Sequence, residues 1–174
     1  MIRKAVRNDL PEIERIMRAS MSDLGAQFYD EAQTASAVRF IAVADLNLID
    51  DGTYFVIEED GRLVACGGWS ARAKLFSGPA SQDRAEGWLN PATDAARIRA
   101  MFVDPAYARR GLGRRILEAA EADAARAGFR TFELMATLPG VPLYRACGYE
   151  EIERTEIELP DGARLQCIRM QRQS

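Results

Sequence analysis

The residues best suited to chemistry lie between Arg97 and Arg115, in the string RIRAMFVDPAYARRGLGRR. An apolar run that ends at Asp104-Pro105 is typical of a strand, and apolar residues at helical spacing begin at Leu112. The glycine-rich loop between them therefore lies at a helix N-terminus, where free backbone N–H groups and the helix dipole favour an anion. A solvated basic helix start is the plainer alternative. The phosphate site is favoured because two glycines coincide there with four arginines: Arg109, Arg110, Arg114 and Arg115.

The loop resembles known phosphate sites only in part. Gly111 and Gly113 begin a dinucleotide-binding fingerprint, and Glu133 lies near the offset of its ribose-binding acid. However, Ile116 occupies the third glycine position, and seven residues, 104–110, separate the strand from the glycines. No nucleotide-binding G-x-x-x-x-G-K-[ST] string exists. A longer, arginine-rich loop suits a pyrophosphate whose carrier arm runs back along the strand, as coenzyme A would.

Histidine is absent from the chain, which limits how an enzyme could move protons. Its absence excludes Ser-His-Asp and Cys-His nucleophilic catalysis and the histidine-based metal motifs. The three cysteines are widely spaced and form no C-x-x-C pattern, so neither a disulfide framework nor a zinc site is indicated. We expect no metal, and proton transfers must use carboxylates, tyrosine, thiol, backbone or water.

The composition fits one soluble globular domain of 174 residues, with 48% hydrophobic and 28% charged residues. A net charge of -3 argues against general binding to nucleic acid or to a membrane surface. No apolar stretch approaches the roughly 20 residues of a membrane span or forms a signal peptide, so a cytoplasmic protein is expected.

The first half of the chain predicts a strand, two helices and a hairpin. Residues 2–7 read as a strand, and Asp9 with Glu12 forms a capping-box start for a helix. Residues 22–30 read as a loop, followed by a second helix that Asp30 and Gln33 begin. The hairpin joins residues 53–58 and 63–69 through an Asp60-Gly61 turn, and Gly67-Gly68 indicates a bulge or a close backbone approach in its second strand.

The second half of the chain predicts the strand–loop–helix–strand unit and a terminal hairpin. A long connection over 71–95, with Phe76 and Trp88, is typical of a binding loop. After the central strand, a helix from Leu112 ends at Gly128, and further elements follow: a strand over 129–137, a short helix over 143–148 and strands over 151–159 and 163–171. These elements predict an α/β domain with a mixed sheet, helices on both faces and a parallel crossover over 97–136.

The motifs in residues 97–149 resemble the GNAT superfamily of acyl-CoA-dependent N-acetyltransferases. They are Val103-Asp104-Pro105, Arg109-Arg110-Gly111-Leu112-Gly113 and Leu143-Tyr144-Arg145-Ala146-Cys147-Gly148-Tyr149. The order of elements agrees over the whole chain, which implies one acetyltransferase domain spanning 1–174. The resemblance also implies a central, mostly antiparallel seven-stranded sheet that contains one parallel crossover.

The resemblance implies acetyl-CoA as cosubstrate and gives its binding residues. The pantetheine arm would pair with Phe102 and Val103, and the loop would hold the pyrophosphate. At the first position of the family pattern Q/R-x-x-G-x-G/A this chain has Ala108, and Arg109 is the expected substitute. The loop residues implied are Arg109, Arg110, Gly111, Leu112, Gly113 and Arg114.

The same resemblance places Tyr144 as the acid that protonates the leaving thiolate, with packing against the thioester as the alternative role. A backbone N–H at Phe102 or Val103 would stabilise the oxyanion. Glu133 could take the amine proton directly or through water, although a solvent-facing position explains it about as well. For Cys147 a packing role is expected.

The acceptor implied is a primary amine of a small molecule or of a protein, and dimers are common among proteins of this kind. Arg97 and Arg99 would favour a carboxylate-bearing acceptor if they face it, and otherwise would pair with surface acids. A non-catalytic acyl-CoA-binding or regulatory module is the alternative function, and a dinucleotide-dependent enzyme is a more distant one.

Overall fold

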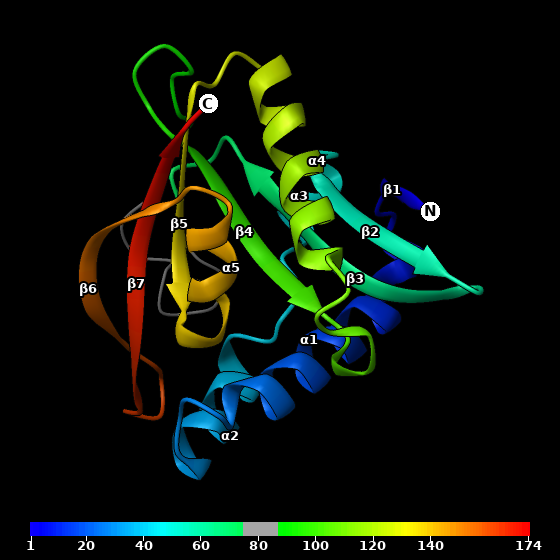
Figure 1. Cartoon of the computed structure of the whole chain (residues 1–174), viewed down its shortest axis with the longest axis vertical. Helices are drawn as coiled ribbons and strands as arrows, with labels where there is room; N and C mark the ends of the chain where they lie inside the picture. The colour runs from blue at the N-terminus through cyan, green and yellow to red at the C-terminus, as the bar shows by residue number, and fades with distance from the viewer. Residues whose placement is uncertain (75–86) are drawn as a thin grey trace.

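A computed structural model of the chain describes residues 1–74 and 87–174 (Figure 1). The described residues form helices, 3-10 turns and strands. In chain order they are β1 (Ile2–Lys4), η1 (Arg7–Asp9), α1 (Leu10–Gly25), α2 (Glu31–Phe40), α3 (Leu46–Asp50), β2 (Tyr54–Glu59), β3 (Arg62–Ser70), β4 (Ala96–Val103), η3 (Pro105–Tyr107), α4 (Leu112–Arg126), β5 (Thr131–Thr137), η4 (Leu138–Gly140), α5 (Val141–Ala146), β6 (Glu150–Glu158) and β7 (Arg164–Gln173).

The strands form one seven-stranded sheet in the order β1-β2-β3-β4-β5-β7-β6. Strands β4 and β5 pair in parallel, and the other neighbours pair antiparallel. Helix α4 connects the parallel pair and lies across the sheet in Figure 1. The predicted mixed sheet with one parallel crossover is confirmed.

Both faces of the sheet are covered by helices, because its inner strands are apolar on both sides. In β2, Tyr54 and Val56 belong to a core that includes the buried residues of α1. Phe55 and Ile57 alternate with them and belong to a second core with α4 and α5. Side chains along a strand point alternately to opposite faces, so the continuous apolar run of β2 supplies both layers.

The first helix begins where predicted, with Asp9 as its N-cap residue, but the predicted capping box does not form. The Asp9 carboxylate accepts a hydrogen bond from the Val6 N–H (2.8 Å) and pairs with Arg3 (2.7 Å), so its side chain closes the turn η1 and makes no capping bond to α1. Helix α1 also continues to Gly25, through the first part of the segment 22–30 expected to be a loop. The first strand is shorter than expected and ends at Lys4.

The predicted capping box of the second helix and the predicted hairpin turn are both confirmed. Asp30 and Gln33 form a capping box at α2, with the Gln33 N–H 2.8 Å from Asp30 Oδ1. At the hairpin turn Asp60 and Gly61 have φ values of 50° and 74°, as a type I′ turn requires. The short helix α3, with Asp45 as its N-cap, was not predicted.

The long connection after β3 is described at its two ends. The backbones of Arg72 and Trp88 form an isolated antiparallel β-bridge, and the Arg72 guanidinium lies 4.5 Å from the centre of the Trp88 ring. Phe76, which we expected in the same binding loop, lies outside the described residues. Further on, β5 begins at Thr131 and α5 at Val141, each two residues from the predicted start, and the terminal hairpin is confirmed. None of the helices in residues 1–74 and 87–174 is long and apolar enough to cross a membrane.

Candidate active site

The sheet is opened between β4 and β5. In the described residues their register consists of two pairs, Ala96 with Phe132 and Arg97 with Glu133. Beyond these pairs the strands part, although each continues for several residues. Backbone groups of β4 that face β5 are therefore left free to pair with a bound molecule.

A bulge in β4 lies beside this opening. The register between β3 and β4 shifts between Cys66 and Gly68, and Ala100 has a φ of 53°. The Tyr54 hydroxyl donates to the Ala100 carbonyl (2.7 Å) and fixes the bulge. Opposite it, a Cβ on Gly67 would lie 2.3 Å from the Met101 sulfur, so glycine is required there. The bulge predicted at Gly67-Gly68 thus lies in β4 and not in β3, because Ala100 and Met101 oppose Gly67 alone. The close backbone approach predicted at the same glycines is confirmed, since a Cβ on Gly68 would lie 2.2 Å from the Thr53 carbonyl oxygen.

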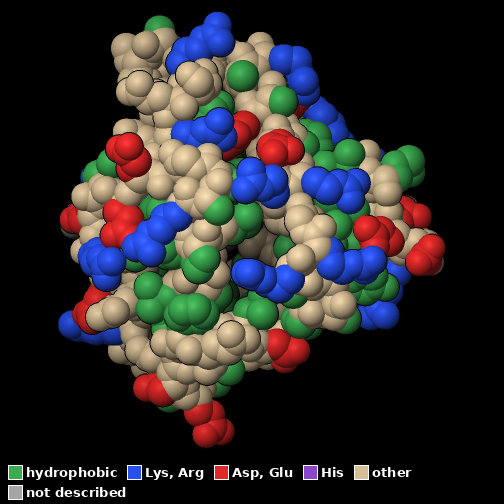
Figure 2. Space-filling model, viewed as in Figure 1, with side chains coloured by type: hydrophobic (Ala, Val, Ile, Leu, Met, Phe, Trp, Pro, Cys, Tyr) green, Lys and Arg blue, Asp and Glu red, His purple; other side chains and the backbone are tan. Residues whose placement is uncertain are grey.

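Two adjoining cavities of about 80 and 140 Å³ occupy the opening. The smaller extends toward α2, β6 and β7, and the larger toward Gly113 and α5. Figure 2 shows a hollow in the middle of the face that carries α4 and α5, with basic side chains around it. Both cavities share five lining residues, Met21, Met101, Phe102, Thr137 and Tyr144.

The larger cavity leads to the glycine-rich loop at the start of α4. Arg109 and Gly111 both have left-handed backbone angles, with φ of 65° and 77°, and Gly111 is the N-cap. The first helical bond runs from the Arg115 N–H to the Gly111 carbonyl (3.1 Å). The N–H groups that precede Arg115 therefore have no acceptor within the helix, as expected for a helix start. This is the backbone arrangement that binds phosphates.

The loop arginines are exposed but differ in their contacts. Arg110 pairs with Glu59 (3.5 Å) and stacks on the Tyr107 ring, and Arg114 donates to the Ala146 carbonyl (3.2 Å). Arg109 has no ion pair within residues 1–74 and 87–174. The N–H of its neighbour Ala108 donates a hydrogen bond to the Pro105 carbonyl. In the described chain the side chain proposed to replace the missing family residue thus makes no ion pair or hydrogen bond to the protein, and the same holds for the side chain of Arg115.

Strand β4 contributes differently through its two predicted residues. The Asp104 N–H donates to the Val64 carbonyl of β3 (2.9 Å). Because backbone groups along a strand alternate in direction, the N–H and carbonyl of Val103 point to the opening, whereas those of Phe102 point to β3. Phe102 instead lines both cavities with its side chain.

Tyr144 lies in the wall of both cavities and is 8% exposed. Gly140 allows this position, since a Cβ there would lie 2.8 Å from Cε2 of the ring. Tyr149 packs against the ring edge-on, at 5.8 Å between centroids. Burial, and secondarily Cys147, raise the pKa of the Tyr144 phenol above its ordinary value. The hydroxyl makes no hydrogen bond to a described residue, so it stays protonated and available.

Glu133 is separated from this group. It is buried where β4 and β5 still pair, and its carboxylate contacts Arg97 and lies 3.5 Å from Arg169. It lines neither cavity. The structure therefore does not bring Glu133 together with Tyr144 at the opening.

The other expected acceptor contacts are also engaged within the protein. Arg97 pairs with Glu133, and Arg99, which is 3% exposed and lines the smaller cavity, pairs with Asp45 (2.5 Å). In the described residues no cluster of three or more histidine, cysteine or acidic side chains is arranged to hold a metal ion. Sequence reasoning missed the α1 residue Met21, whose contribution depends on how α1 crosses the sheet.

Comparisons with known proteins agree with this geometry. The profile of the Acetyltransferase (GNAT) family matches residues 13–149. No curated protein sequence matches significantly. The chain belongs to the GNAT family of acetyltransferases, and the resemblance read from its motifs is confirmed.

Solved structures share the fold at low sequence identity. A GCN5-related N-acetyltransferase from Rhodopseudomonas palustris is 19% identical, with a TM-score of 0.77 over 100% of this chain and 95% of that one. The PaiA N-acetyltransferase from Thermoplasma acidophilum, in complex with coenzyme A, is 15% identical with a TM-score of 0.69 (100% and 98% covered). The structure of yncA from Salmonella typhimurium, with acetyl-CoA, is 18% identical with a TM-score of 0.65 (99% and 92% covered).

Proposed function

We propose that this chain transfers an acetyl group from acetyl-CoA to a primary amine of a small molecule. One observation carries the proposal: a single opening in the sheet joins an anion-binding helix start to a buried tyrosine. The two cavities that fill the opening meet at Tyr144, and the larger one reaches Gly113 in the first turn of α4. Membership of an acetyl-CoA-dependent family supports the choice of acyl donor.

The residues present fit acetyl-CoA. The free N–H groups at Gly111, Leu112 and Gly113 suit a pyrophosphate, and Arg109 and Arg114 add charge beside them. The free backbone edge of Val103 suits the amide-bearing pantetheine arm. When bound, acetyl-CoA supplies the acetyl thioester, while the protein holds its phosphates and aligns its arm.

Tyr144 is proposed as the acid, acting through its hydroxyl. A departing thiolate needs a proton, and a phenol kept protonated by burial retains that proton until negative charge develops beside it. The Val103 N–H, which points into the opening, is proposed as the donor that stabilises the developing oxyanion.

For the base, the geometry favours water over Glu133. Both carboxylate oxygens of Glu133 are engaged by arginines, one by Arg97 and one by Arg169. The carboxylate also lines neither cavity, so it does not reach the place where the amine would lie. The amine is therefore proposed to lose its proton to water that enters with it.

A small acceptor is favoured by the contacts around the smaller cavity. The Tyr29 hydroxyl joins the end of α1 to β7 by donating to the Gln166 carbonyl (2.7 Å) and accepting from the Leu138 N–H (3.0 Å). Gln33 and Ser36 of α2 bond to the β6–β7 hairpin at 2.8 and 2.7 Å. These bonds hold that side of the smaller cavity together, and its volume of about 80 Å³ supports a compact amine over an extended chain.

Two measurements test the proposal. Acetyl-CoA and CoA should raise the melting temperature of the protein, whereas NAD should not, since a ligand that binds the native state stabilises it. Release of free thiol should then be followed with a panel of small amines and with short peptides. CoA binding without thiol release from any amine would indicate a non-catalytic acyl-CoA-binding module, and turnover only with peptides would contradict the small acceptor.

A further inference from the structure

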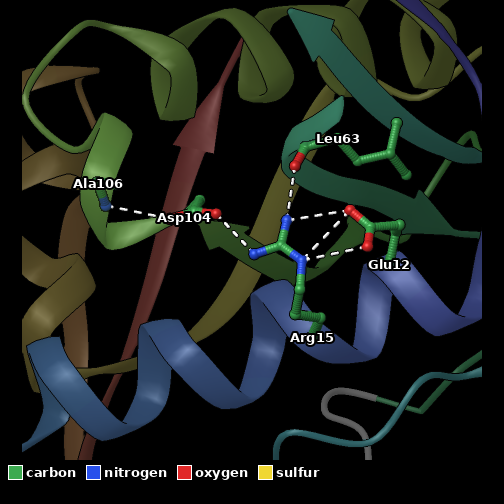
Figure 3. Close-up of polar contacts among 5 residues, drawn as sticks. All are labelled: Glu12, Arg15, Leu63, Asp104 and Ala106. Atoms are coloured by element: carbon green, nitrogen blue, oxygen red, sulfur yellow. Dashed lines mark hydrogen bonds and ion pairs between the residues drawn. The ribbon is translucent and has the colours of Figure 1, made fainter. Parts of the chain in front are cut away.

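A side chain of α1 contacts the strand end that precedes the anion-binding loop (Figure 3). The Arg15 guanidinium donates to Asp104 Oδ2 at 2.7 Å and to the Leu63 carbonyl of β3 at 2.9 Å. Its remaining N–H groups face Glu12, one turn earlier on α1, at 3.2 Å. One arginine thereby connects α1, β3 and the residue that directly follows β4.

Asp104 passes this restraint on to the loop. It is 5% exposed, and its Oδ1 accepts from the Ala106 N–H (3.0 Å) while its carbonyl accepts from the Tyr107 N–H (2.8 Å). Both bonds close the turn η3, which leads directly to Arg109 and Gly111. With Oδ2 held by Arg15 and Oδ1 by the turn, the carboxylate leaves the loop few alternative positions.

We propose that Arg15 is a positioning residue that holds the anion-binding loop in place through Asp104. It makes no contact with the opening itself, and neither cavity is lined by it. Its effect is to fix the loop N–H groups before a ligand arrives, so that no binding energy is lost in ordering them. The consequence for the phosphate end of acetyl-CoA rests on the proposed function.

The experiment compares Arg15→Gln with Arg18→Gln. Arg18 lies on the same helix, is half exposed and pairs with Glu14 at 3.5 Å, so it serves as a matched control. In the ligand-free proteins, amide hydrogen exchange at Ala106 and Tyr107 should be about tenfold faster in Arg15→Gln, and unchanged in Arg18→Gln. Unchanged exchange in both variants would overturn the proposal whether or not acetyl-CoA binds.

The second readout compares two acetyl donors by calorimetry and by their KM values. Arg15→Gln should bind acetyl-CoA about tenfold more weakly, with kcat nearly unchanged. A tenfold change in Kd corresponds to the net free energy of about one hydrogen bond to a charged group, which is the contact that orders the loop. Binding of S-acetylpantetheine, which lacks the phosphates, should be unaffected. Equal weakening of both donors would mean a general structural role and would contradict the proposal.

Arg15→Lys and Asp104→Asn keep the test usable if Arg15→Gln folds poorly. Lysine keeps the charge beside Asp104 but lacks the two separate nitrogens with which Arg15 bonds Asp104 and the Leu63 carbonyl, so it should restore part of the acetyl-CoA affinity. Asp104→Asn added to Arg15→Lys should cost little more than the worse single variant, because the two residues act as a unit. Additive losses would overturn the proposed connection. If the wild-type protein binds no acetyl-CoA, the proposed function fails, while the exchange data still decide whether Arg15 holds the loop.

Discussion

The position of its hydroxyl at the opening gives Tyr144 its proposed role as an acid. The Tyr144→Phe variant keeps the ring that packs against Tyr149 and loses only the hydroxyl. We expect its kcat to fall about 100-fold, which is typical for loss of a general acid, with little change in acetyl-CoA affinity or melting temperature. Thiol release at saturating acetyl-CoA measures the effect, and turnover equal to that of wild type would disprove the assignment.

Tyr149→Phe is the matched control for that variant. The Tyr149 hydroxyl donates to Glu121 at 2.8 Å, in a buried site outside both cavities. Its loss should lower stability by roughly 1–2 kcal/mol, because Glu121 loses a donor, and should leave kcat nearly unchanged. A large loss of kcat in Tyr149→Phe would show that the rate is sensitive to packing around α5 in general.

Glu133 is expected to matter for stability more than for catalysis. Glu133→Gln leaves the largely buried Arg97 without its carboxylate partner, while Arg169 keeps Glu153 at 3.6 Å, and the change should cost roughly 3 kcal/mol. Urea unfolding measures this loss. The kcat/KM for the amine, measured at saturating acetyl-CoA, should stay within about threefold of wild type, since catalytic bases contribute far more than that. A hundredfold loss with unchanged stability would instead identify Glu133 as the base.

Two glycines of the loop and helix start are needed for different physical reasons. Gly111 has a φ of 77° and open space around a would-be Cβ, so Gly111→Ala should cost about 1 kcal/mol in backbone strain. Gly113 lies in the helix, and a Cβ there would meet the flexible Leu143 tip at 2.9 Å. Gly113→Ala should therefore fold normally but bind CoA more weakly, because its methyl group stands at the cavity wall.

Melting temperature and CoA affinity together distinguish the two variants. Each should be measured without ligand and in a CoA titration. Gly113→Ala binding CoA as tightly as wild type would mean that the phosphates do not approach the first turn of α4. A Gly111→Ala protein as stable as wild type would mean that the loop relaxes to another backbone conformation.

Elements with local signals were predictable from the sequence. Asp30 caps a residue three positions away, and the Asp60-Gly61 turn depends on backbone preference alone, so neither needs knowledge of the fold. Asp9 has the same local signal as Asp30 and behaves differently. Its carboxylate is taken by Arg3, which lies beside it only once β1 has paired with β2.

The candidate site follows the same division. Loop and helix residues from Arg109 to Arg114 are contiguous, so their common location could be predicted. The contact that engages Glu133 away from the opening comes from Arg169, 36 residues later in the chain. Only the pairing of β5 with β7 brings these two side chains together, so the sequence does not predict it. Arg15 and Asp104 are 89 positions apart, and no spacing rule in the sequence connects them.

The whole molecule should lose stability in acid partly through Asp9. The hydrogen bond from Arg3 outweighs burial and lowers the pKa of Asp9 below its ordinary value of 3.8. The unfolded chain then binds a proton more readily than the folded one, so this contribution is complete above the ordinary pKa and is lost as the pH falls through the lowered one.

Melting temperature measured against pH checks this contribution. Asp9→Asn should melt below wild type at pH 7, and the gap between the two proteins should narrow as the pH falls below 3.8 and close once the pH lies below the lowered pKa of folded Asp9. A gap of constant size from pH 7 to pH 3 would show that Asp9 contributes through packing and not through charge.

The parting of β4 and β5 also divides the molecule mechanically. On one side lie β1 to β4 and on the other β5, β7 and β6, and two residue pairs carry the hydrogen-bonded ladder between them. A cosubstrate arm laid along Val103 would act as a partial strand and close this seam. Bound acetyl-CoA would then make the two halves of the sheet more rigid relative to each other. Amide hydrogen exchange in β4 and β5 should become slower when the cosubstrate binds.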